Sequence, residues 1–123
     1  EIVSRDWSSD VCSSDLHASD AVIFGKEASR LPNTLAFAIP GLTAETALMA
    51  FDLAGVALSS GSACSSGKVK RSHVLDAMGV ASDIAKGALR LSFGYSSTND
   101  DVIRFLSTCE DIVRKMKTRT RAA

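Results

Sequence analysis

The pattern of apolar and polar positions predicts three helices along the chain. The clearest is 97–116, where apolar residues recur at intervals of three and four, as on one face of a helix. Thr98 and Asp101 have the spacing of a capping box at its start. The segment 43–55 begins with a threonine suited to an N-cap and ends at a glycine, and 72–80 is a shorter helix with similar ends. The basic sequence KTRTRAA that follows the longest helix is expected to be a frayed tail.

Three other segments have the character of strands. The apolar run 33–40 is bounded by prolines, and 56–60 is a short run after the first helix. The segment 87–94 alternates with a period of two, which is typical of a half-buried strand. The residues of this strand that are expected to face solvent are Ala88, Arg90 and Ser92. A serine- and glycine-rich loop, 61–67, follows the second strand.

The order of these elements is β-α-β-loop-α-β-α. It predicts an α/β fold of the α+β small-domain kind, a small sheet covered by helices, and we expect those helices on one face of the sheet. The length of 123 residues allows one domain at most, and the apolar share of 46% supports a modest core. Because the chain does not begin with Met, we interpret it as a fragment.

The start of the chain, 1–16, is interpreted as a translated sequencing-library adapter. The stretch DWSSDVCSSDL, which ends it, matches a translation of a widely used adapter codon by codon. The alternative is a disordered tail rich in serine and aspartate. Under the adapter interpretation Trp7 and Cys12 carry no function, and the native segment is 17–123, a partial C-terminal small domain.

Charge and cysteine usage exclude several classes of function. Lys plus Arg equals Asp plus Glu, at 14 each, so the net charge points to neither nucleic acid nor a membrane surface. No apolar run is long enough to span a bilayer, and no signal peptide is visible. The three cysteines form no C-x-x-C pair and no cluster with histidine, which argues against a metal site and for a reduced, cytoplasmic protein.

Two of the cysteines differ in their surroundings. Cys109 lies on the apolar stripe of the last helix and is expected in the core. Cys64 lies among serines and glycines, with Lys68 and Lys70 close enough in sequence to favour a thiolate. Taken alone, this pattern leaves open an inert loop cysteine, a reactive thiol, or a loop whose backbone N–H groups cradle a phosphate.

The motifs SSGSACSSG, SHVLDAMGV and ALRLSFG resemble the C-terminal part of pyridoxal-phosphate-dependent cysteine desulfurases of the aminotransferase class V type. The resemblance extends to LPNTLAFAIPGLTAETALMAFDLAG and STNDDVIRFL, so it covers roughly 17–116. The subgroup it indicates has its catalytic cysteine on a long mobile loop. It implies the C-terminal small domain of a fold-type I enzyme, which works as a homodimer.

The resemblance implies a role for two residues. Cys64 would be the nucleophile that takes sulfur from L-cysteine as a persulfide, leaves L-alanine, and passes the sulfur to an acceptor such as an iron–sulfur scaffold protein. A glycine- and serine-rich tether suits a thiol that must move. Arg90 would bind the α-carboxylate of the substrate, because a guanidinium can hold a carboxylate with two parallel hydrogen bonds. Asn33 could help to orient the site, and His73 is expected to be a surface residue.

The resemblance also implies what this segment lacks. The lysine that holds pyridoxal phosphate belongs to the large domain of such enzymes, so we expect no cofactor-binding residue here and no activity from the isolated chain. Two alternatives remain open: a non-catalytic module that carries sulfur or docks a scaffold, and a fragment of a selenocysteine lyase.

Overall fold

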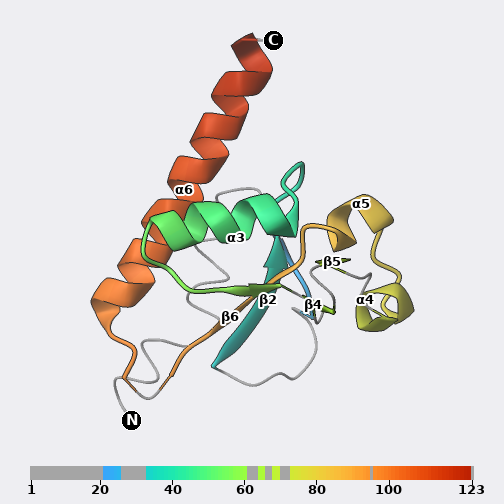
Figure 1. The fold of residues 1–123 in the computed structure, drawn as a ribbon, viewed down its shortest axis with the longest axis horizontal. Coiled ribbons are helices and arrows are strands. Elements are labelled where there is room, and N and C mark those ends of the chain that lie inside the picture. Colours follow the sequence, from blue (N-terminus) through green and yellow to red (C-terminus); the bar gives the residue numbers. More distant parts are fainter. Residues whose placement is uncertain are drawn as a thin grey trace.

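The computed structural model describes residues 21–25, 33–60, 64–65, 68–69, 73–94 and 96–122, and for 64–65 and 68–69 it describes the backbone alone. The described chain forms one main sheet with helices on both of its faces (Figure 1).

The main sheet has four antiparallel strands in the order β1-β2-β6-β3. They are β1 (Val22–Ile23), β2 (Thr34–Ala38), β3 (Ser59–Ser60) and β6 (Leu89–Ser92). The last three lie within the predicted strand segments, whereas β1 is an additional strand that the apolar pattern does not reveal. The two central strands, β2 and β6, carry the longest run of paired residues, so they set the register of the sheet.

The register separates the side chains of the sheet into two sets. Leu35 pairs with Leu91 and Phe37 with Leu89, and all four are buried on the first face. The residues between them belong to the second face. The mixed fold of a small sheet with helices, expected from the order of the elements, is therefore confirmed.

Two helices cover the first face, namely α3 (Ala44–Leu53) and α6 (Asn99–Ala122). Figure 1 shows α3 crossing α6 on one side of the strands. The ring of Phe105 stacks on Phe51 at 5.7 Å between centroids and meets Phe37 edge-on at 5.6 Å. These three rings join both helices to the sheet and form the centre of the larger core.

The caps predicted for the two longer helices are present, while the one predicted at Ser72 lies outside the described residues. The Thr43 hydroxyl accepts a hydrogen bond from the Thr46 N–H at the start of α3, and the helix is followed by Gly55 at φ +81°. At the start of α6 the Asp101 carboxylate accepts hydrogen bonds from the Thr98 N–H and hydroxyl, at 2.8 and 3.1 Å. Both helices thus begin where the sequence predicts, within two residues.

The C-terminal end of α6 differs from the prediction. Instead of fraying after residue 116, the helix continues to Ala122 and projects past the rest of the fold (Figure 1). No glycine or proline interrupts this part of the sequence, and Arg119 and Arg121 lie in the last turn, where positive charge interacts favourably with the helix dipole. The basic segment therefore lengthens the helix.

Two short helices lie on the second face, which corrects the expectation of helices on one face only. They are α4 (His73–Ala77) and α5 (Ser82–Ala85). Leu75 of α4 packs with Phe24, Ala38 and Ala88 in a second, smaller core. Ala88, expected to face solvent together with Arg90, is instead buried, because this end of the second face is covered.

The predicted loop 61–67 contains a short paired segment. Strand β4 (Cys64–Ser65) pairs antiparallel with β5 (Lys68–Val69), with Cys64 opposite Val69, and the two form a sheet of their own. The cysteine thus belongs to a hairpin-like unit that is not hydrogen-bonded into the main sheet.

Candidate functional site

Arg90 lies in β6, between two other strands on the second face of the sheet. Ala36 of β2 is opposite it on one side and Ser59 of β3 on the other. Both neighbours are small, and Arg90 is exposed while Leu89 and Leu91 beside it are buried. The alternation predicted for this strand is therefore confirmed at Arg90, which is exposed on the second face.

The described residues that pair across the sheet beside Arg90 carry no opposing charge. Thr34 and Ser92, the next opposed pair on the same face, are uncharged. Among the described residues, no acidic side chain forms an ion pair with Arg90. An exposed arginine on a strand, without a bound carboxylate of its own, can accept a carboxylate from a ligand.

The position of β6 is fixed by close packing at its start. The Ala44 N–H donates a hydrogen bond of 3.0 Å to the carbonyl oxygen of Lys86, which links the first turn of α3 to the chain before β6. Gly87, one residue later, lies directly against the backbone of Leu42. Arg90 therefore follows three residues after a segment that is anchored to α3.

Cys64 follows, a few residues later in the chain, the strand that pairs with Arg90. Ser59 is opposite Arg90, and Ser60 ends β3, so four residue steps separate the end of this strand from Cys64. At about 3.3–3.6 Å per residue, four steps reach at most ~14 Å. The Cys64 backbone therefore lies within this distance of the end of β3, the strand that pairs with Arg90. Its side chain falls outside the described structure.

Three other residues considered from the sequence lie within the described structure. Cys109 is 1% exposed in the larger core, as predicted. His73 is exposed at the first residue of α4. Asn33 accepts a hydrogen bond from Phe93 N–H through its carbonyl oxygen, and one from the Thr34 hydroxyl through its side chain. Trp7, Cys12 and Lys70 lie outside the described residues, as does the side chain of Lys68.

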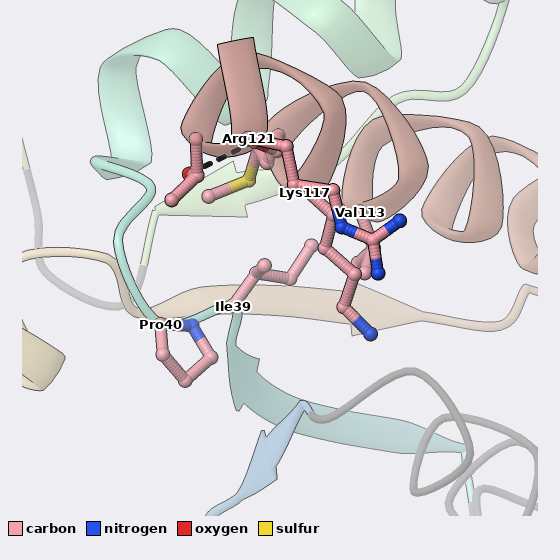
Figure 2. A pocket seen from close by; sticks show the side chains of 7 residues that line it. Ile39, Pro40, Val113, Lys117 and Arg121 are labelled. Carbon is pink, nitrogen blue, oxygen red and sulfur yellow. Dashed lines mark hydrogen bonds between the residues drawn. The ribbon is translucent and has the colours of Figure 1, made fainter. Parts of the chain in front are cut away.

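A groove of about 410 Å³ lies elsewhere, between the end of β2 and the C-terminal half of α6. In Figure 2 the side chains of Lys117 and Arg121 extend from α6 on the side that faces Ile39 and Pro40. The groove is lined by Ile39, Pro40, Val113, Met116, Lys117, Thr120 and Arg121. It contains none of the residues predicted to carry chemistry, so it is separate from the Arg90 face.

A smaller hollow of about 140 Å³ lies where β6 ends, beside the first turns of α6. Ser92, Ser97, Asp101 and Arg104 supply its polar lining. In the described ranges, no three His, Cys, Asp or Glu side chains gather in a way that could hold a metal ion.

None of the helices described here is long and apolar enough to cross a membrane.

Comparison with protein families gives a match over most of the chain. The model described as aminotransferase class-V matches residues 8–105. The match begins inside 1–16, so the boundary drawn at residue 17 stays a prediction. Two curated relatives are a cysteine desulfurase named IscS from Dictyoglomus turgidum, 38% identical over 100 residues, and a cysteine desulfurase from Gluconacetobacter diazotrophicus, 42% identical over 98 residues.

These alignments cover 81% and 80% of this chain but only 25% and 24% of the relatives. The chain thus spans about a quarter of the length of the curated relatives it matches. Solved structures agree: a NifS-like protein from Rickettsia africae superposes with a TM-score of 0.63 at 35% identity, over 75% of this chain and 23% of that one. A second NifS-like protein gives a TM-score of 0.68 at 32% identity, over 83% of this chain and 25% of that one.

Proposed function

Because the chain belongs to the aminotransferase class-V family, we propose that it is the C-terminal small domain of a cysteine desulfurase. The parent enzyme takes sulfur from L-cysteine and leaves L-alanine. The observation that carries this proposal is the pairing of an exposed Arg90 with Ser59 on the second face of the sheet, with Cys64 a few residues beyond the strand of Ser59. A group suited to a carboxylate and a thiol thus belong to neighbouring segments of the fold, which supports the proposal.

The reaction assigns each residue one task. Arg90 holds the α-carboxylate of L-cysteine through two parallel hydrogen bonds. The Cys64 thiolate attacks the sulfur of the substrate, the substrate carbon–sulfur bond breaks, and the carbon takes a proton. One thiol and one cysteine thus become one persulfide and one alanine, so no external oxidant or reductant is needed. The persulfide sulfur then passes to the thiol of an acceptor.

Pyridoxal phosphate, the cofactor proposed for the parent enzyme, supplies the electron sink for breaking the carbon–sulfur bond. The described residues do not fit this group. On the second face, the described residues beside Arg90 are Thr34, Ala36, Ser59 and Ser92, a set with no lysine to hold the cofactor and no carboxylate to face its ring nitrogen. We therefore assign cofactor binding to a part of the parent enzyme other than these residues.

The proposal also extends to assembly. The parent enzyme is a homodimer in the cytoplasm, and the sulfur acceptor is a protein such as an iron–sulfur scaffold. The basic run of Lys68, Lys70 and Arg71 beside Cys64 in the sequence suits an acidic acceptor surface.

Purified parent enzyme with Cys64→Ser tests the proposal. Alanine release from L-cysteine and the persulfide mass on the peptide containing position 64 are measured, with Cys109→Ser as the matched control. We expect Cys64→Ser to abolish both products and Cys109→Ser to keep the persulfide on Cys64. Alanine release at the normal rate from Cys64→Ser would refute the assignment.

The isolated 123-residue chain is expected to remain colourless with added pyridoxal phosphate and to release no alanine. A yellow, active chain would contradict the proposal that cofactor binding belongs to another part of the parent enzyme.

A further inference from the structure

Arg90 has a small residue directly opposite it on each side, Ala36 in β2 and Ser59 in β3. Opposed side chains in antiparallel strands have Cβ atoms about 4.5–5.5 Å apart. A longer side chain at either position would therefore lie against the stem of Arg90. Thr34 and Ser92, the next pair on this face, also have short side chains. The side chains around Arg90 on this face of the sheet are therefore all small.

We propose that Ser59 and Ala36 are positioning residues for Arg90, and that their small size leaves both sides of the guanidinium open to a carboxylate. The proposal rests on the function proposed above, because the carboxylate is that of L-cysteine. Bidentate binding requires two N–H groups of the planar guanidinium to meet both carboxylate oxygens in one plane. A larger side chain at position 36 or 59 would tilt the guanidinium or cover one of these N–H groups.

Packing accounts for the small side chain at only one of the two positions. Ala36 is half-buried and packs against the second core, so a larger residue there is also restricted by its neighbours. Ser59 is exposed on a strand at the edge of the described sheet. Exposed strand positions favour β-branched and aromatic residues. The serine is therefore not required by packing, and position 59 gives the cleaner test.

The first experiment measures access to Arg90 in the 123-residue chain. Ser59→Leu is compared with Ser59→Ala, and phenylglyoxal modification of Arg90 is followed by mass spectrometry of its peptide. We expect Ser59→Leu to slow the modification severalfold and Ser59→Ala to leave it unchanged. Arg119, which is far along α6, is the internal reference. Equal modification of Arg90 in all three proteins would overturn the proposal.

The second experiment measures steady-state kinetics in the parent enzyme loaded with its cofactor. Ser59→Leu is expected to raise KM for L-cysteine about tenfold with little change in kcat, because binding to the carboxylate weakens in the ground state and the transition state alike. Ser59→Ala should leave both constants unchanged. Ser59→Val, whose β-branched side chain suits a strand, should give an intermediate KM and replaces Ser59→Leu if that variant melts early. An unchanged KM in both bulky variants would refute the positioning role.

Arg90→Gln separates the two levels of the proposal. If Arg90→Gln raises KM while Ser59→Leu does not, the carboxylate role of Arg90 stands and only the positioning role fails. If Arg90→Gln leaves KM unchanged, the carboxylate role itself is wrong. Ala36→Leu, with Ala36→Ser as its small control, repeats the test from the other side of the arginine.

Discussion

A Cβ atom on Gly87 would lie 2.4 Å from the carbonyl oxygen of Leu42. Two segments distant in sequence, the turn before α3 and the turn before β6, therefore touch through their backbones. The neighbouring hydrogen bond from Ala44 N–H to the Lys86 carbonyl holds the same contact. Since Leu89 and Arg90 follow directly, this contact determines where β6 starts and where the arginine stands.

Gly87→Ala is expected to destabilise the chain by about 1–3 kcal/mol, because the added methyl group forces two backbones apart. Urea unfolding followed by circular dichroism measures the change. Gly94→Ala is the control, since its Cβ would meet nothing closer than the Ser97 hydroxyl at 3.9 Å; it should be neutral or stabilising by about 0.4–1 kcal/mol. Equal effects of the two substitutions would contradict the close contact.

Phe105→Ala is expected to cost about 3–5 kcal/mol of unfolding free energy, because it leaves a cavity between Phe51 and Phe37. Ile103, two residues earlier on α6, is 58% exposed. Ile103→Ala should therefore change stability by less than about 0.5 kcal/mol. Similar losses in the two variants, measured by denaturant unfolding, would show that Phe105 is not at the centre of the core.

Asp101→Ala is expected to lower stability by about 0.5–1.5 kcal/mol. The substitution removes the carboxylate that accepts hydrogen bonds from the Thr98 N–H and hydroxyl. Asp100 lies beside it in the first turn and has the same charge. Asp100→Ala loses only the interaction with the helix dipole, about 0.3 kcal/mol for an exposed group. Thermal unfolding of both variants measures the difference, and a larger effect at Asp100 would speak against the cap.

Alkylation should distinguish the cysteines of the folded chain. Cys109 is 1% exposed, so its reaction with iodoacetamide requires local opening and is expected to be at least ~100-fold slower than in urea. Cys64, on its serine- and glycine-rich tether, is predicted to react quickly in the folded state. Peptide mapping by mass spectrometry gives each rate. A Cys109 that reacts as fast as Cys64 without denaturant would exclude its place in the core.

Local sequence signals predict much of the fold. Thr43 and Thr98 mark helix starts because capping depends on residues three apart in the same segment. The alternation around Arg90 predicts which side of β6 it occupies, because the period of two belongs to one strand. The assignment of Cys109 to the core rests on helical periodicity in the same way.

Other features depend on parts of the chain that are distant in sequence. The pairing of Arg90 with Ser59 and Ala36 requires the strand order β2-β6-β3, which local patterns do not contain. Ala88 is buried because Leu75 covers it from another segment, whereas alternation alone assigns it to the exposed set. Strand β1 has only two residues, and α5 one turn, so neither gives a periodic signal.

The division of the apolar interior into two cores has a consequence for motion. The sheet separates a large cluster, built around three phenylalanines, from a small one of Phe24, Ala38, Leu75 and Ala88. Few buried contacts hold the small cluster, so its opening requires less free energy than global unfolding. The helices α4 and α5, which pack on the small cluster, therefore have the lower local stability, while β6 is held by α3 and α6 through the large one. These two short helices can open locally while the arginine-bearing strand keeps its shape.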